Sequence, residues 1–296
     1  MAAAGKWLSV RAWSRRHVGL VIQVEQRFRD DRALIMAAAL SYTSLLSLVP
    51  LLAIALAILA AFPAFEGVRG ELQSTLLQYL VPEVGEQLRR VIANFIGNAG
   101  KLTAVGVLGL AVTAVLLLVT IEDALNHIFR VSRPRSPLSR LLVYWTVITL
   151  GPLLLGASLS LSAWVFAADG WAMRHGLAAM AGAVSALFPL VLLTALFSLL
   201  YSAVPNRAVR MADAATGGAV AAIAMAVLRW GFHLYVTSAH AYESVYGALA
   251  VVPLLLFWMY LAWAAVLAGA ELTAALPEWR AAPPPGHPNP SLLRTS

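Results

Sequence analysis

The placement of the charged residues constrains the fold of this chain more than any other feature. In a chain of 296 residues, the charged residues leave six long intervals without Asp, Glu, Lys or Arg. A helix needs about 20 apolar residues to cross the hydrocarbon core of a bilayer, and five of the six intervals reach that length. The intervals are Ala33–Phe65, Leu102–Ile121, Leu141–Ala168, His175–Asn206, Ala214–Leu228 and Ser244–Ala270.

The composition agrees with a membrane protein. Charged residues make up 12% of the chain, whereas a soluble domain carries about 25%. The absence of cysteine excludes a disulfide-stapled secreted domain. We therefore predict an all-α polytopic membrane protein with a bundle of six transmembrane helices. The predicted spans are residues 38–62, 102–121, 141–166, 178–202, 214–237 and 246–270.

The fifth span is the shortest interval, and its helix must continue through Arg229 and His233 to reach the length of a bilayer. We include it because the run AATGGAVAAIAMAVL is rich in small residues. Small residues let neighbouring helices approach closely in lipid, so this run predicts tight helix packing.

Three regions follow from this division: a basic arm at 1–32, a transmembrane domain at 33–276 and a disordered, proline-rich tail at 277–296. In the arm, apolar and basic residues segregate at helical spacing, which predicts an amphipathic helix at the membrane interface. The alternative is a solvated arm that only sets topology. The apolar side is formed by Val10, Trp13, His17, Val21, Val24 and Phe28, and the polar side by Arg11, Arg15 and Gln26.

The connection 66–101 is long for a loop, and Pro82 divides it. Val84, Leu88, Val91 and Phe95 recur at helical spacing in its second half. We expect two short amphipathic helices on the outer face. They would serve either as a structural cover or as a docking site for partner proteins.

The basic residues predict the orientation. Fifteen of the 21 lie on the side of the two termini and six on the other side, which predicts that both termini are in the cytoplasm. Membrane topology thus explains the net charge of +7, and we expect membrane lipids rather than nucleic acid as partners. No apolar signal-peptide core precedes Ala33, so no signal peptide is expected.

Polar residues inside or beside spans are costly in lipid and must face protein or water. In the first span, Ser41, Tyr42 and Ser47 precede Pro50, which is expected to kink the helix. The serine hydroxyls would either satisfy backbone carbonyls or line a polar cavity between helices.

Glu122 and Asn126 stand one turn apart at the end of the second span, as a polar ridge or a water-exposed helix end. Arg229 and His233 are also one turn apart, near the outer end of the fifth span. For Arg229 we expect an ion pair with Glu243; the alternative is contact with a substrate headgroup.

The sixth helix is expected to bend at Pro253 and to end at Glu271, which would be solvated or paired with Arg207 or Arg210. Its aromatic residues Trp258, Tyr260 and Trp263 lie too deep for an interfacial belt alone, so packing is favoured over a ligand platform. Asn206 and Tyr246 complete the polar residues that we expect in a cavity or a structural network.

Signatures of enzymes are missing from the sequence. The six histidines show no metal-ligand spacing, and neither G-x-S-x-G nor a phosphate-binding P-loop occurs. We therefore expect no catalytic residues, no cofactor, no metal and no ATP site. Any transport would be passive, ion-coupled or driven by a partner.

Four strings resemble the YihY/BrkB family of bacterial inner-membrane proteins: AAALSYTSLLSLVPLLAIALA, IEDALNHIFRVSRPRS followed by YWTVITLGPLLLG, YSAVPNRAVR, and YGALAVVPLLLFWMYLAWAAVLAGAEL. The resemblance covers about Phe28 to Leu276. It implies a six-span inner-membrane protein; some members are linked to serum resistance and others to export of lipid A or envelope lipids. The family's former label, ribonuclease BN, is regarded as a misassignment. The family-like positions are Ser41, Tyr42, Ser47, Pro50, Glu122, Asn126, Pro205, Asn206, Tyr246, Gly247, Gly269 and Glu271.

Two hypotheses of function follow. In the first, the protein moves, or helps to export, an envelope lipid or other amphiphile. In the second, it is a non-transporting scaffold that docks envelope-assembly proteins through residues 66–101.

Overall fold

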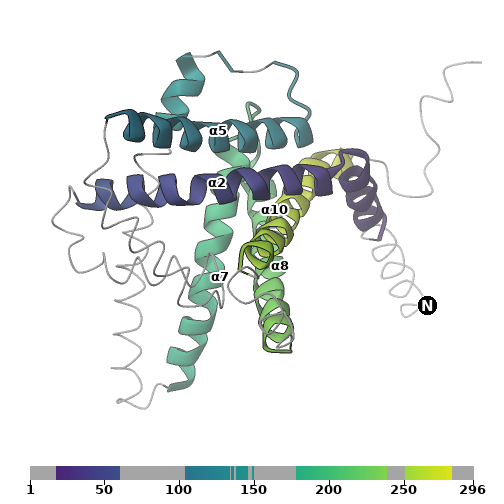
Figure 1. The fold of residues 1–296 in the computed structure, drawn as a ribbon. Helices are drawn as coiled ribbons and strands as arrows, with labels where there is room; N and C mark the ends of the chain where they lie inside the picture. Colours follow the sequence, from purple (N-terminus) through teal and green to yellow (C-terminus); the bar gives the residue numbers. More distant parts are fainter. Residues whose placement is uncertain are drawn as a thin grey trace, which may run out of the picture.

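The computed structural model describes residues 18–60, 104–133, 135–136, 138–145, 149, 178–238 and 251–281. Every regular element within these ranges is a helix (Figure 1). A helix at 18–30 is followed by α2 (Ala33–Ala60), α5 (Ala104–Ile128) and a short helix at 138–145. Then come α7 (Ala178–Ala203), α8 (Met211–Ser238) and α10 (Val251–Ala281). The all-α prediction is therefore confirmed for the described part of the chain.

The helices coincide with the apolar intervals because a helix satisfies its own backbone hydrogen bonds, which lipid cannot do. Met211–Tyr235 and Val252–Ala281 are each long and apolar enough to cross a membrane, and shorter apolar helices cover Ala33–Leu48 and Leu187–Ala203. The third predicted span is described only at 138–145 and 149. The number of six spans therefore stays a prediction, and the loop 66–101 lies outside the described residues.

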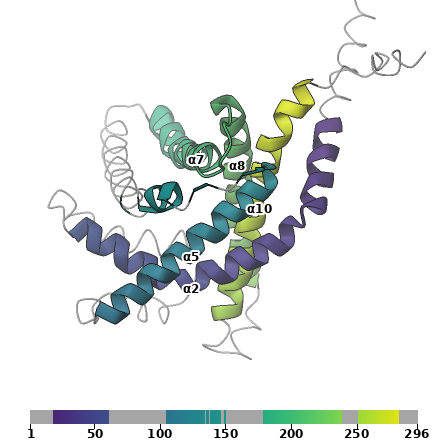
Figure 2. The same cartoon turned by 90° about the horizontal axis from the view of Figure 1, so that it is seen from above.

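The helices form two pairs with α10 between them (Figures 1 and 2). α2 packs against α5, and α7 packs against α8; α10 packs along both α8 and α2. The two pairs run in clearly different directions. One apolar core joins the pairs beside the start of α2 and the end of α10, and a second, around Phe232 and Trp258, joins α8, α10 and α2 further along.

Close contacts between small residues hold α7, α8 and α10 together. A side chain added at Gly217 would collide with Thr273 and with the carbonyl of Gly269 on α10. One added at Gly218 would lie 2.8 Å from the carbonyl oxygen of Thr194 on α7. The tight packing predicted for this glycine-rich run is thus confirmed.

One boundary differs from the prediction. α10 continues to Ala281 through Pro277, so residues 277–281 are helical rather than part of a disordered tail. Pro253 is the third residue of α10, and the residues just before Val251 lie outside the described ones, so the bend expected at Pro253 stays a prediction. Pro50 lies inside α2, and Pro189 lies inside α7.

Candidate functional site

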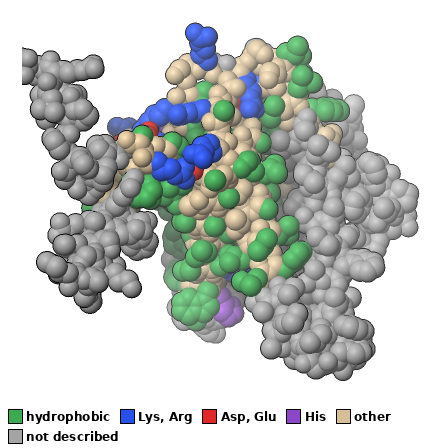
Figure 3. Space-filling view, turned by 180° about the vertical axis from the view of Figure 1, so that it is seen from behind, with side chains coloured by type: hydrophobic (Ala, Val, Ile, Leu, Met, Phe, Trp, Pro, Cys, Tyr) green, Lys and Arg blue, Asp and Glu red, His purple; other side chains and the backbone are tan. Residues whose placement is uncertain are grey.

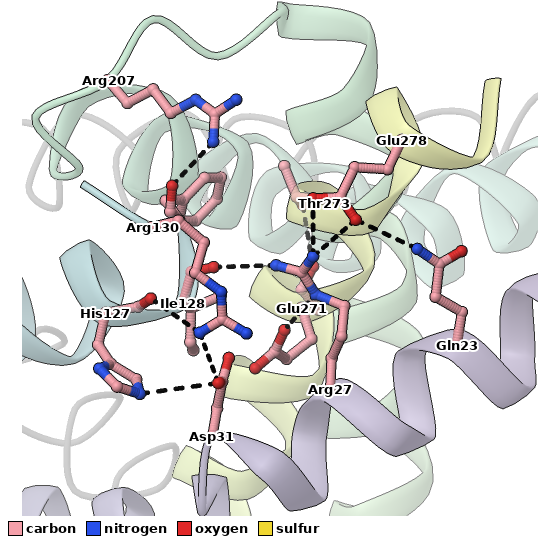
Figure 4. Close-up of polar contacts among 12 residues, drawn as sticks. Gln23, Arg27, Asp31, His127, Ile128, Arg130, Arg207, Glu271, Thr273 and Glu278 are labelled. Carbon is pink, nitrogen blue, oxygen red and sulfur yellow. Dashed lines mark hydrogen bonds and ion pairs between the residues drawn. The ribbon is translucent and has the colours of Figure 1, made fainter. Parts of the chain in front are cut away.

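The ends of five helices meet on one side of the bundle in a group of charged contacts that we call the junction (Figure 4). Helix 18–30, α5 and α10 contribute its central residues, and the segment 203–211 between α7 and α8 lies beside them. The central residues are Gln23, Arg27, Asp31, His127, Arg130, Glu271 and Glu278.

Arg27 holds three helices together. Its Nε donates to Glu271 Oε2 at 3.2 Å, and its Nη1 donates to both oxygens of Glu278 at 2.9 Å. Its Nη2 donates to the carbonyl oxygen of Ile128 at 3.1 Å, which satisfies a free carbonyl at the end of α5. Burial alone would lower the pKa of Arg27, but the hydrogen bonds to Glu278 and Glu271 outweigh it and raise the pKa above its usual value. The guanidinium therefore stays charged.

Asp31 links the end of helix 18–30 to the end of α5. Arg130 Nη1 donates to Asp31 Oδ1 at 2.5 Å, and His127 Nε2 lies 3.7 Å from the same oxygen. Arg130 has a φ of 54°, and Val131 N bonds to the carbonyl of Asn126 while Arg130 N bonds to that of His127. These bonds form a Schellman motif, in which the left-handed position is usually glycine. Arg130, which pairs with Asp31, therefore adopts a left-handed backbone conformation that is unfavourable for residues other than glycine.

Glu122 is the centre of a second cluster, next to the junction on α5. The side chain is 1% exposed. Its Oε2 accepts hydrogen bonds from Arg140 Nε at 3.0 Å and from the Tyr144 hydroxyl at 2.5 Å. Arg140 Nη2 also donates to Asp123 at 2.6 Å, and the hydrogen bond to Glu122 raises the pKa of Arg140 despite partial burial. The ridge at the end of the second span is thus a buried ion pair rather than a solvated helix end.

The connection between α7 and α8 is fastened to the end of α5. Asn126 Oδ1 accepts a hydrogen bond from the backbone N–H of Asn206 at 2.8 Å, so the structure brings these two predicted residues together. Arg207 donates to the carbonyl of Phe129 at 2.9 Å, and Arg135 donates to that of Ala203 at 3.0 Å. Each arginine satisfies a carbonyl at or near a helix C-terminus, where positive charge is favourable.

Glu271 differs from its prediction in the identity of its partner. We predicted either solvation or a pair with Arg207 or Arg210. The structure buries it fully and pairs it with Arg27. Arg207 bonds to a backbone carbonyl instead, while Arg280 on α10 pairs with Asp213 in the first turn of α8.

The serines of α2 bond to backbone and to α10 rather than to one another. Ser41 donates to the carbonyl of Ala38 at 2.8 Å, and Ser47 donates to that of Thr113 on α5 at 3.0 Å. Ser44 accepts a hydrogen bond from Trp263 Nε1 at 2.9 Å. These contacts favour the structural interpretation of the serines. Tyr42 is 60% exposed on the outer side of α2.

The remaining predicted residues are not part of the junction. Arg229 and His233 are exposed on the half of α8 that is remote from it. Glu243, the expected partner of Arg229, and Tyr246 lie outside the described residues. Trp258 is buried against Phe232, with ring centroids 4.8 Å apart, as its packing interpretation predicted.

Sequence reasoning missed Arg27, Asp31, Arg140 and Tyr144. A signal for the first two was present: Gln23, Arg27 and Asp31 recur every four residues and therefore share one face of a helix. This face docks on α10, while Val21 on the same helix is 68% exposed. Among the residues that the structure describes, no three His, Asp or Glu side chains gather as ligands for a metal ion.

Comparison with known proteins decides the family. The family described as "Virulence factor BrkB" matches residues 24–291, which is most of the chain. The chain belongs to this family. The resemblance seen in the four strings is thereby confirmed, and no solved structure matches the chain.

Relatives of this BrkB-family chain carry the name "UPF0761 membrane protein". The one from Rhodospirillum rubrum is 47% identical over 83% of this chain, and the one from Alkalilimnicola ehrlichii is 43% identical over 95%. That from Photobacterium profundum is 37% identical over 89% of this chain and 82% of its own length. The chain spans 56% and 63% of the first two relatives. Together with the apolar helices, these names identify a membrane protein.

Proposed function

We propose that this chain moves, or assists the export of, an envelope lipid or other amphiphile, without an ATP site of its own. One observation carries the proposal. The α2–α5 pair and the α7–α8 pair make their main contacts through α10, and charged side chains join the helix ends at the junction. This arrangement allows relative motion of the two pairs.

The contacts between the pairs support such motion. Helices that touch mainly through a third helix can change their relative direction while most side-chain packing is kept. Rigid-body movement of packed units is a common basis of alternating access in membrane transporters. The tight glycine contacts make α7, α8 and α10 one such unit, and α2 with α5 would be the other.

The distribution of side chains suits an amphiphilic substrate. Lys and Arg side chains gather over one end of the molecule, and hydrophobic side chains cover the face below them (Figure 3). Exposed basic residues at this end include Arg29, Arg32, Arg133, Arg207 and Arg210. Anionic headgroups bind to such clusters, while exposed Leu and Val side chains contact the lipid tails. We infer that the basic end receives headgroups.

The same residues give the orientation that we propose. The segments predicted to be cytoplasmic contribute the residues of the junction: the arm, the end of α5, the 203–211 connection and the end of α10. With the excess of Lys and Arg on this side, we infer that the junction faces the cytoplasm of a bacterial inner membrane.

A flip assay in proteoliposomes tests the proposal. The purified chain is reconstituted with fluorescent phosphatidylglycerol, and dithionite bleaches the label in the outer leaflet. We expect the protein to accelerate bleaching of the inner-leaflet pool severalfold. Equal rates with and without protein would reject autonomous movement of this lipid.

Two variants link the assay to the site. Glu122→Gln breaks the charge contact with Arg140 and is expected to slow flipping. Thr216→Ala on α8 removes a hydroxyl that bonds only to its own helix, at the carbonyl of Ala212, and serves as the matched control. If both variants flip at the wild-type rate, the α5 end of the site has no role in transport.

The scaffold hypothesis rests on residues 66–101, which lie outside the described residues. Deleting this segment should abolish capture of envelope-assembly proteins if the chain is a scaffold. Lipid movement should continue after the same deletion if the bundle itself is the functional unit.

A further inference from the structure

Two buried carboxyl groups face each other in the junction (Figure 4). Asp31 comes from the end of helix 18–30 and Glu271 from α10; their side chains are 4% and 0% exposed. One oxygen of each is held by an arginine, Asp31 Oδ1 by Arg130 and Glu271 Oε2 by Arg27. The other oxygens, Asp31 Oδ2 and Glu271 Oε1, are buried and have no hydrogen-bond partner.

The two carboxyl groups point toward each other (Figure 4). Two ionised carboxylates cannot form a hydrogen bond with each other, because each is only an acceptor and their like charges repel. A single proton between them would supply the donor, satisfy both buried oxygens and remove one negative charge.

The two arginines of the junction leave the facing oxygens of the pair unsatisfied. Arg27 also bonds to Glu278, whose side chain is 54% exposed, and Arg130, which pairs with Asp31 Oδ1, is 46% exposed. Neither arginine hydrogen-bonds to Asp31 Oδ2 or Glu271 Oε1, and leaving a buried carboxylate oxygen without a partner is costly. A metal ion is a poor candidate because only two carboxylate oxygens are open, and hard cations take six or more oxygen ligands.

We propose that Asp31 and Glu271 form a buried site that holds one shared proton, and that loss of this proton releases helix 18–30 from α10. The proposal stands on the two buried oxygens without partners, on the burial of both carboxyl groups and on their facing arrangement (Figure 4), and it does not depend on lipid movement. The other charged or titratable groups around the pair are Arg27, His127, Arg130, Arg207 and Glu278, while Asp213 and Arg280 pair with each other on the side of α8.

The direction of the pH dependence follows from linkage. The docked arrangement binds a proton that separated carboxylates in water would give up at neutral pH. Docking is therefore favoured at low pH and is lost as pH rises through the point at which the pair releases its proton. The contribution of His127, which lies 3.7 Å from Asp31 Oδ1, is separated from that of the pair by the variant His127→Gln.

Infrared difference spectroscopy on the full chain in nanodiscs tests for the proton. A protonated carboxyl shows a C=O stretch that a carboxylate lacks. We expect this band in the wild type at neutral pH, with a shift when glutamate is labelled with carbon-13 or when water is exchanged for deuterium oxide. The band should disappear in Glu271→Gln and in Asp31→Asn, since the new amide donates to the remaining carboxylate.

Two control variants locate the proton. Glu25→Gln, on an exposed residue of the same helix, should leave the band in place. His127→Gln should also leave the band in place. Loss of the band in this variant would show that the proton depends on His127, which would contradict a site formed by Asp31 and Glu271 alone. Absence of the band from the wild type, or its persistence in both Glu271→Gln and Asp31→Asn, would overturn the proposal.

A distance measurement tests release. Because the chain has no cysteine, spin labels can be placed at introduced cysteines in the exposed positions Gln26 and Ala281. The distance distribution should be narrow at low pH and broaden at the pH where the infrared band is lost. In Glu271→Gln it should stay narrow at every pH. A wild-type distribution that stays narrow after the band has gone would show that the proton does not control docking.

Discussion

Arg27 and Glu271 are 244 positions apart in the sequence, and the guanidinium Nε of the first lies 3.2 Å from Oε2 of the second. This ion pair fastens the first described helix to the last one. Because Arg27 also bonds to Glu278 and to the carbonyl of Ile128, one side chain fixes the relative positions of helix 18–30, α5 and α10. The described part of the arm, residues 18–32, is therefore packed on the bundle.

Arg27→Lys should destabilise the protein although it keeps the charge. A lysine ammonium cannot reach three separate acceptors with the fixed fork of a guanidinium. We expect the free energy of unfolding, measured by SDS titration in mixed micelles, to fall by about 2 kcal/mol. Arg29→Lys is the matched control, since Arg29 is exposed and pairs with Glu25 on its own helix. It should change stability by less than about 0.5 kcal/mol, and equal losses in the two variants would contradict the role of Arg27.

The backbone of Arg130 predicts a difference between two substitutions. Arg130→Gly and Arg130→Ala both remove the ion pair with Asp31, but glycine tolerates a φ of 54° and alanine does not. The glycine variant should be more stable than the alanine variant by about 1 kcal/mol, as read from tryptophan fluorescence during unfolding. The same pair of substitutions at Arg32, which has a φ of 53°, should show a similar difference. Equal stability of glycine and alanine at both positions would show that the left-handed conformation costs nothing here.

Two glycines of α8 should respond in opposite ways to alanine. At Gly218 an added methyl group would lie within 3 Å of Thr194 and Ser198 on α7, whereas at Gly231 it would meet open space. We expect Gly218→Ala to lower the free energy of unfolding by about 1–3 kcal/mol through overpacking. Gly231→Ala should be neutral or stabilise by up to about 1 kcal/mol, because alanine favours helices. A stable Gly218→Ala variant would mean that α7 and α8 separate more easily than their contacts indicate.

Removal of the Tyr144 hydroxyl tests the second cluster. Tyr144→Phe deletes one donor to the buried Glu122 and leaves Arg140 in place. We expect a loss of about 1–2 kcal/mol in unfolding free energy, because a buried carboxylate oxygen loses a hydrogen bond. The neighbouring Trp145, which is exposed, provides the control Trp145→Phe. A smaller loss for Tyr144→Phe than for Trp145→Phe would exclude the hydroxyl as a significant partner of Glu122.

The positions of the helices were predictable because the charges are sparse. α2, α5, α7, α8 and α10 each overlap one charge-free interval, and the glycine-rich run does make close helix contacts. Lipid requires a helix wherever such a run is long enough, so position along the chain is encoded locally. The end of α10 was less predictable, because its last turn is held by contacts of Arg280 and Glu278 with other helices.

The partners of the buried charges were not predictable in the same way. Helices that are apolar on all sides give no sign of which face meets which neighbour. The prediction for Glu271, either solvation or a pair with Arg207 or Arg210, was therefore wrong, since its partner is Arg27. Glu122 and Asn126 were recognised as unusual, yet Arg140 and Tyr144 were not, because their proximity depends on how the 138–145 helix folds back on α5.

The central place of α10 has a consequence for biosynthesis, since α10 follows every other described helix in the chain. The hairpin-like pairs α2–α5 and α7–α8 must leave the ribosome and enter the bilayer before the helix that joins them exists. Until then Arg27 and Asp213 lack their carboxylate and guanidinium partners on α10. These charges therefore stay without their α10 partners at the membrane surface until the last described helix has been synthesised.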